Sequence, residues 1–271
     1  MAPARRRDDH RLLAFLASAV AIVVWATTAS AAAVPVRYEI GTARGFLVLR
    51  DMDGKLLAHG EQVQTVEQTR ITKRLTFHFI DGSLDDEQTT YSQDGMLRLI
   101  TYHHTQKGPS FPHPIEMSID AATGHVTVHY DDDDGNPQTE DTTLKLPDDV
   151  ANGMVVDVLQ NVRPSALPLT VSYVAATPKP RLIQLKITGG GRDTFSTAGT
   201  SHGAMHYTLA VHLGGLEGML GSWAGKLPPD SHVWITDGVP TFVESETVLA
   251  TGGPMWRIET APFVPPHRTS R

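Results

Sequence analysis

The stretch Ile71-Thr72-Lys73-Arg74-Leu75-Thr76-Phe77-His78-Phe79-Ile80 decides the fold of this chain. Its large apolar residues Leu75, Phe77 and Phe79 alternate with polar ones, which is a period of two. Successive side chains of a β-strand point to opposite faces, so this alternation predicts a strand with one buried face.

Turn signals on both sides of this stretch indicate how such strands are connected. Arg44–Arg50 and Leu56–Glu67 flank Asp53-Gly54, and Asp-Gly between two strand-like runs is typical of a β-hairpin. Asp81-Gly82 and Asp94-Gly95 indicate turns between the strands that follow. Turns about ten residues apart indicate an antiparallel meander rather than alternating strands and helices.

The remaining strand-like runs, in chain order, are Met96–His103, Ile115–Asp120, His125–Tyr130, Leu169–Ala175, Arg181–Thr188, Thr194–Thr197, Ala204–Leu213, His232–Thr236, Thr241–Leu249 and Trp256–Thr260. One segment between them has a helical period instead. Pro147-Asp148-Asp149 opens a run whose apolar residues fall on one helical face, and Arg163-Pro164 ends it. We therefore predict a helix at Asp148–Val162. The fold class is mainly β: a curved antiparallel sheet or incomplete β-barrel with this one α-helix packed on it.

The N-terminus has the three parts of a secretory signal peptide. The basic triplet Arg5-Arg6-Arg7 precedes the uncharged run Leu12–Ala26, and the small-residue stretch Ala29–Ala33 follows. We expect a peptidase to remove residues 1–31, which makes the mature protein periplasmic or secreted; cleavage two residues later fits the same pattern. The alternative is a retained membrane anchor, because no charge interrupts the chain from Leu12 to Val36.

Composition excludes several classes of function. Removal of residues 1–31 takes four Arg and two Asp from 23 basic and 30 acidic residues, which leaves a net charge of −9. Such a surface has no general attraction for nucleic acid. The absence of cysteine excludes disulfides, thiolate catalysis and cysteine-ligated metals. We expect residues 34–261 to form a single β-rich domain and residues 262–271, with three prolines, to be a disordered tail.

A glycine-rich segment, residues 214–225, lies between two predicted strands and carries apolar residues at helical spacing. It is interpreted either as a mobile apolar flap or as a short buried connector. Large aromatic and sulfur-containing side chains in this part of the chain are typical of an apolar cavity beside the predicted helix. The residues that we expect to contact an apolar ligand, a lipid or acyl chain, are Trp223, Trp234, Met219, Leu220, Val155 and Leu159. This hypothesis makes the protein a non-enzymatic binding protein that needs no cofactor.

Thirteen histidines provide a second set of candidates. His202, His206 and His212 share strand parity, so a continuous strand would place them on one face. Neutral imidazoles bind zinc or copper, although scattered solvent-exposed histidines are the simpler interpretation. The alternative functions are a metal-binding module or metal-dependent enzyme that uses these histidines, and an envelope structural or partner-binding protein. The sequence does not set the oligomeric state.

Three further motifs have simple structural interpretations. Gly199–Gly203 fits the G-x-S-x-G pattern of serine hydrolases, but strand-like runs on both sides favour a hairpin turn. Asp131–Asp134 fails the register of a calcium-binding EF-hand loop and is interpreted as a solvated hairpin tip. Asp85-Asp86-Glu87 is interpreted mostly as solvation, because neighbours on a strand point to opposite faces. No catalytic residue is assigned.

Several stretches resemble a family of uncharacterised exported bacterial β-proteins: Lys107–Pro112, Ala175–Arg181, Pro229–Ile235 and Gly252–Glu259. This resemblance covers Ile71 to Glu259 and implies no known activity. The order of meander, helix after Leu146-Pro147-Asp148 and returning strands is more distantly similar to the half-barrel of periplasmic lipoprotein carriers, as is the pattern from Trp234 to Pro240. Those carriers hold acyl chains between a curved sheet and helices, so the resemblance implies an apolar-ligand site in the same place.

Overall fold

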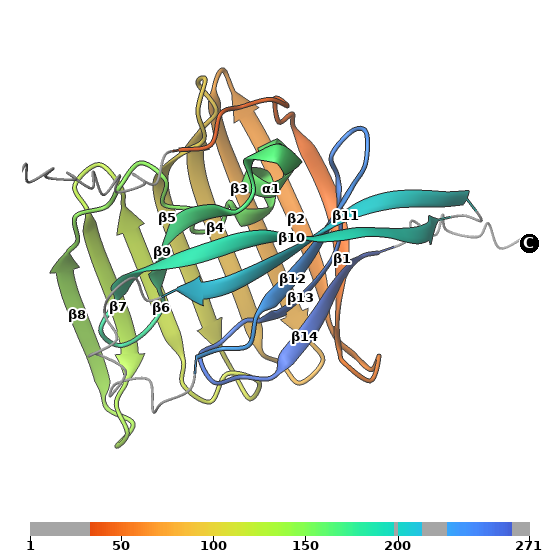
Figure 1. The fold of residues 1–271 in the computed structure, drawn as a ribbon. Helices are drawn as coiled ribbons and strands as arrows, with labels where there is room; N and C mark the ends of the chain where they lie inside the picture. The colour runs from red at the N-terminus through yellow and green to blue at the C-terminus, as the bar shows by residue number, and fades with distance from the viewer. Residues whose placement is uncertain (1–32, 198–199, 213–226, 262–271) are drawn as a thin grey trace, which may run out of the picture. The chain divides into compact units, whose positions relative to one another are not determined.

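The computed structural model describes residues 33–197, 200–212 and 227–261. In these residues, fourteen strands form one antiparallel sheet (Figure 1). The strands are β1 (Ala43–Asp51), β2 (Leu56–Glu67), β3 (Arg70–Phe79), β4 (Leu84–Ser92), β5 (Arg98–Lys107), β6 (Ile115–Asp120), β7 (His125–Asp131), β8 (Pro137–Thr143), β9 (Leu169–Ala175), β10 (Arg181–Thr197), β11 (Thr200–His212), β12 (Ser231–Thr236), β13 (Phe242–Val248) and β14 (Met255–Thr260). Strands β8 and β9 form the two edges, so the sheet does not close into a barrel. The predicted fold class is confirmed.

The first and last of these strands lie side by side in the middle of the sheet. β1 pairs with β2 on one side and with β14 on the other, where Leu47 is opposite Thr260 and Asp51 is opposite Trp256. Every other pair of neighbouring strands is consecutive in the chain. The sheet therefore consists of two meanders, β1–β8 and β9–β14, joined by the β1–β14 pairing, which we call the seam.

One face of the sheet, which we call the inner face, carries two hydrophobic clusters. The larger cluster joins the two meanders, since Ile71 of β3 and Met117 of β6 share it with Ile187 of β10 and Tyr207 of β11. The smaller cluster lies at the seam and includes Trp256 of β14. The sheet curls so that β9–β12 pack over β3–β7, and Figure 1 shows β9–β11 crossing the strands of the first meander.

The predicted helix Asp148–Val162 is wrong at its start. The helix α1 runs from Val155 to Asn161 only, and a 3-10 turn, η1 (Pro164–Ala166), follows it. Gly153 has a φ of +68°, and a Cβ there would lie 1.8 Å from the hydroxyl of Thr89. The backbone therefore leaves the helical conformation at Gly153 to pass close to β4. Within the described ranges, no helix is long and apolar enough to cross a bilayer.

The residues before α1 cover the edge of β9 instead of forming helical turns. The backbone N–H of Ser172 donates to Asp149 Oδ2 (3.1 Å), and Asn152 exchanges two hydrogen bonds with the backbone of Val174 (2.8 and 2.9 Å). Asp and Asn side chains readily bond backbone groups in this way, in competition with helix formation. This use of Asp149 and Asn152 is why the sequence pattern overestimated the helix.

Two strand predictions also differ from the structure. Arg181–Thr188 and Thr194–Thr197 belong to one strand, β10, because Gly189–Gly191 forms a β-bulge rather than a turn. Strand β8 was not expected, because Pro137–Thr143 has no apolar alternation and its side chains are exposed or half-buried.

Candidate functional site

Strand β4 places acidic side chains on the inner face. Asp86 points outward and is bound by Arg74 (2.8 Å) and Thr76 (2.6 Å), whereas Asp85 and Glu87 point inward. The interpretation of this acidic run as mostly solvation is therefore wrong for two of its three residues. The signal that could have found them is strand parity: Asp85 and Glu87 share a face with Tyr91 of the same strand, which is buried in the larger cluster.

Asp85 forms a buried hydrogen-bonded group with two residues of β5. His104 Nε2 lies 2.7 Å from Asp85 Oδ1, and Gln106 Nε2 donates to the same oxygen at 3.0 Å. Gln106 also donates to the backbone carbonyl of Leu249 (2.9 Å), which ties this group to the end of β13. Asp85 is 5% exposed and His104 is 8% exposed. A carboxylate so buried is costly unless hydrogen-bond donors such as these satisfy its oxygens.

The environment of His104 favours its charged form. Burial lowers the pKa of His104, but the hydrogen bond to Asp85 and the negative charges of Asp85, Glu87 and Asp86 outweigh burial, so the pKa is raised above 6.5. An imidazolium beside a carboxylate is a strong, charge-assisted pair. The Asp85–His104 hydrogen bond therefore stabilises the charged form of His104 on the inner face.

Glu87 lies between an apolar and a polar neighbour on the inner face. Its register partners are Leu75 on β3 and His104 on β5. The Tyr102 hydroxyl donates to Glu87 Oε2 (2.9 Å), and burial together with the charge of Glu87 raises the pKa of both Tyr102 and Tyr173. Glu87, Leu75 and Tyr173 are half-buried, so solvent reaches the inner face here. We call Asp85, Glu87, Tyr102, His104 and Gln106 the interior polar cluster.

A buried ion pair fixes α1 to the sheet. Lys73 of β3 pairs with Asp157 of α1, and both side chains are less than a tenth exposed. At the end of α1, Asn161 Oδ1 accepts hydrogen bonds from the backbone N–H groups of Arg37 (2.7 Å) and Tyr38 (2.9 Å). These contacts hold the helix against the inner face.

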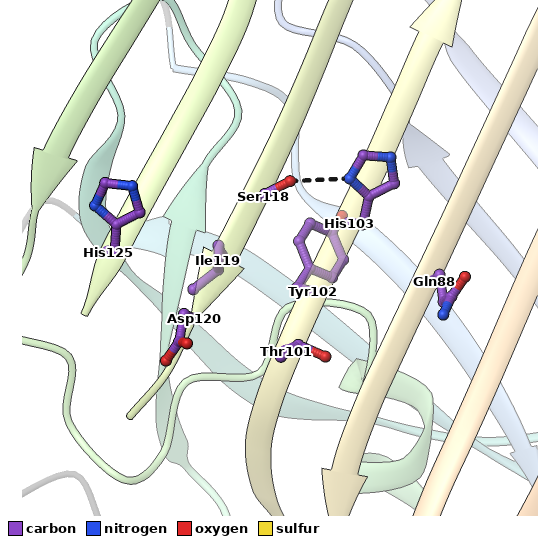
Figure 2. A pocket seen from close by; sticks show the side chains of 8 residues that line it. All are labelled: Gln88, Thr101, Tyr102, His103, Ser118, Ile119, Asp120 and His125. Atoms are coloured by element: carbon purple, nitrogen blue, oxygen red, sulfur yellow. Dashed lines mark hydrogen bonds between the residues drawn. The ribbon is translucent and has the colours of Figure 1, made fainter. Parts of the chain in front are cut away.

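The outer face of the first meander carries a shallow depression of about 260 Å³ (Figure 2). Its lining residues are Gln88, Thr101, Tyr102, His103, Ser118, Ile119, Asp120 and His125. His103 Nδ1 lies 2.9 Å from Ser118 Oγ, and its Nε2 lies 3.6 Å from Glu116. These are the residue types of a catalytic triad. However, the strands that line the depression bond to one another through their backbone N–H groups, so these groups are not available to form an oxyanion hole.

The residues expected to contact an apolar ligand divide between the two faces. Val155 and Leu159 lie on α1 and pack in the larger cluster, whereas Trp234 lies on the outer face of β12. The structure therefore does not bring Trp234 together with the helix. Met219, Leu220 and Trp223 lie outside the described residues, as does Gly199 of the G-x-S-x-G motif, whose Ser201 is in β11.

The three candidate metal-binding histidines do not converge. His202 stacks on Phe195 (ring centroids 5.5 Å apart), and His212 is exposed at the end of β11. His206 instead faces His232 of β12, with 3.0 Å between His206 Nε2 and His232 Nδ1. In the part of the chain that the structure describes, no three His, Asp or Glu side chains are grouped to hold a metal ion.

Comparisons with known proteins found similarity to solved structures only. No family model matches the chain, and no curated protein matches it. One of the similar solved structures is a β-barrel-like protein of a domain of unknown function, DUF1849, from Brucella abortus. The identity is 10% and the TM-score 0.47, and the match covers 82% of this chain and 97% of that protein.

Proposed function

We propose that the protein acts after export as a non-enzymatic binding protein for an amphipathic, mainly apolar ligand held on the inner face of the sheet. The apolar part of the ligand lies against Leu75, Phe242 and Leu249, and its head group reaches Glu87. The ligand class is a lipid or another long-chain molecule whose head group donates hydrogen bonds.

The observation that carries this proposal is the position of Glu87. It places a carboxylate on the inner face, half-buried next to the apolar side chain of Leu75. Glu87 has one hydrogen bond, from Tyr102, and its carboxylate shares the inner face with the Asp85–His104 pair. The two carboxylates outnumber the single imidazole, which can carry at most one positive charge, so this cluster favours a hydrogen-bond donor or a cationic head group.

The apolar half of the proposal rests on half-buried side chains next to the interior polar cluster. Leu75 and Leu249 pack on the smaller hydrophobic cluster, and Phe242 packs on both clusters. All three remain half-buried rather than buried. Burial of such surface by an acyl chain stabilises a complex by about 0.8 kcal/mol per CH₂ group.

The test combines identification of the natural ligand with a probe of its head group. Native mass spectrometry and lipid extraction are applied to the mature protein purified gently from the envelope of its own cells. Two fluorescent probes of equal chain length, a long-chain amine and a fatty acid, are then titrated into the protein. We expect a co-purifying apolar molecule and tighter binding of the amine.

Matched substitutions locate the site. Glu87→Gln is expected to abolish the preference for the amine, and Leu75→Gln to weaken both probes. Glu116→Gln and Val63→Gln, at exposed outer-face positions, are the controls and should leave binding unchanged. An empty protein that binds neither probe, or equal effects of inner-face and outer-face substitutions, would overturn the proposal.

A further inference from the structure

His206 and His232 form a histidine pair on the outer face of the second meander that the proposed function does not use. His206 lies opposite Trp234 in the β11–β12 register, and His232 lies opposite Thr208. The 3.0 Å between His206 Nε2 and His232 Nδ1 is a hydrogen-bond distance, so one ring donates a proton that the other accepts. Both ring nitrogens therefore point at the same shared position.

The ring of His206 is held in place from both sides. On one side it stacks on Trp234, with ring centroids 4.5 Å apart and 4° between the ring planes. On the other side lies Gly190 of the β10 bulge, where an added Cβ would come within 2.4 Å of His206 Nδ1. Trp234 is itself fixed by a hydrogen bond from its Nε1 to Asp193 Oδ2 (2.7 Å). The glycine bulge thus makes room for an imidazole whose orientation is set before any ligand arrives.

The spacing of the two nitrogens fits two ligands of one metal ion. Imidazole nitrogens bound at about 2.0 Å to the same ion are about 2.8 Å apart in a square-planar site and about 3.3 Å apart in a tetrahedral one. The observed 3.0 Å lies between these values. Among divalent first-row ions, copper(II) binds nitrogen ligands most tightly and prefers tetragonal geometry.

Negative charge next to the pair favours a cation. Asp193 and Glu246 both interact electrostatically with His206, and Glu246 is the register partner of His232 on β13. Glu246 also forms an ion pair with Arg257 (2.7 and 3.2 Å), which keeps its carboxylate beside the strand and offsets part of its charge. Among the described residues, no third His, Asp or Glu side chain joins the pair, so the other coordination positions of a bound ion would be open to water.

We propose that His206 and His232 form an open two-histidine binding site for copper(II). The ion lies beside the line that joins the two nitrogens and binds both, and the proton that the rings share moves to the other nitrogen of its own ring, so both ligands are neutral imidazoles. This site differs from one built on His202, His206 and His212, because its second ligand comes from the neighbouring strand β12.

Copper titration of the untagged mature protein tests the proposal. Isothermal titration calorimetry is expected to give one equivalent of bound copper(II), and electron paramagnetic resonance a tetragonal signal with two nitrogen ligands. Since a paramagnetic ion quenches a nearby indole, the Trp234 emission should fall on binding. His206→Gln and His232→Gln are each expected to weaken binding about tenfold or more.

Three variants separate this site from other histidines. His202→Gln and His212→Gln should bind copper as the parent protein does. Gly190→Ala keeps every histidine but pushes the His206 ring aside, so it should weaken binding and reduce the Trp234 quenching. Thermal unfolding checks that each variant is folded. Unchanged copper binding in both His206→Gln and His232→Gln, or equal loss in His202→Gln, would sink the proposal.

Discussion

Lys73 and Arg74 are adjacent on β3, yet their ion pairs lie on opposite faces of the sheet. Lys73 is buried with Asp157, whereas Arg74 pairs with Asp86 and has a side chain that is 59% exposed. Lys73→Met leaves the carboxylate of Asp157 buried without its partner, so we expect a loss of about 3–5 kcal/mol in the free energy of unfolding. Arg74→Met is the control, with a loss of about 0–1 kcal/mol. Chemical denaturation of both variants measures the difference.

The same ion pair allows a second check. The double variant Lys73→Met/Asp157→Leu removes both charges, and we expect it to recover most of the stability that Lys73→Met loses. If the double variant is as unstable as the single one, packing rather than the unpaired charge explains the loss.

His104 makes stability depend on pH in a direction set by its raised pKa. A raised pKa in the folded state stabilises the fold fully below the unfolded value of 6.5, and this contribution is lost as the pH rises through the folded-state pKa. We therefore expect His104→Gln to be most destabilising at about pH 5.5 and less so at about pH 8.5. Thermal unfolding at both pH values measures this. His103→Gln, on the outer face, is the control; an effect of His104→Gln that grows with pH would contradict the assignment.

At the residue scale, the sequence predicted which side chains are buried better than which side chains bond to one another. The alternation of Leu75, Phe77 and Phe79 correctly indicates the inner face of β3. The pairing of His206 with His232 could not be predicted, because it depends on which strand lies next to β11 and in what register. Asp85 was missed because its partners, His104 and Gln106, come from another strand.

Gly153 separates α1 from the turns before it and is expected to tolerate no side chain. Both Gly153 and Gly135 have positive φ values, +68° and +79°, but only Gly153 has no room for a Cβ. Gly135→Ala should lower stability by about 1–2 kcal/mol through backbone strain alone. Gly153→Ala should cost about 1–3 kcal/mol more, because its Cβ would collide with Thr89. Equal losses in denaturant unfolding would show that the contact with Thr89 relaxes freely.

At the element scale, turn chemistry was a better guide than helical periodicity. Asp53-Gly54 correctly predicts the β1–β2 hairpin, because the short turn needs a positive φ that glycine adopts easily. The apolar spacing in 148–162 suits a helix, but the helix starts only at Val155 because Asp149 and Asn152 bond to β9. That competition arises only once β9 has an open edge to cover.

At the scale of the whole molecule, the packing of the first described residues favours one of the two expected signal-peptide cleavage sites. Val34 is buried, its carbonyl accepts a hydrogen bond from the Leu97 N–H (2.9 Å), and Val36 donates to Gly95 (3.0 Å). Cleavage after Ala33 would place a charged amino group on buried Val34, which is unfavourable. We therefore expect the mature chain to begin at residue 32. Intact mass and N-terminal sequencing of the exported protein measure this, and an uncleaved chain would support the anchor alternative instead.

At this scale the sequence predicted a meander and an open sheet but not how the sheet is joined. Strand-like runs and turns follow from local patterns, and consecutive strands usually pair. The seam joins Leu47–Asp51 to Trp256–Thr260, segments separated by more of the chain than any hairpin. No local pattern specifies such a pairing, and neither does any pattern specify that β9–β12 pack over β3–β7.

The seam also implies an order of folding, in which β1 pairs with β2 before it pairs with β14. A chain that emerges with its N-terminal end first can pair β1 with β2 at once, but the other edge of β1 has no neighbour until Thr260 has emerged. Contacts between such distant segments form slowly, since a long loop must close before they contribute any stability. The central strand of the finished sheet is thus the last to gain its second neighbour. A protein built this way keeps its sheet open along the middle until its last strand is available.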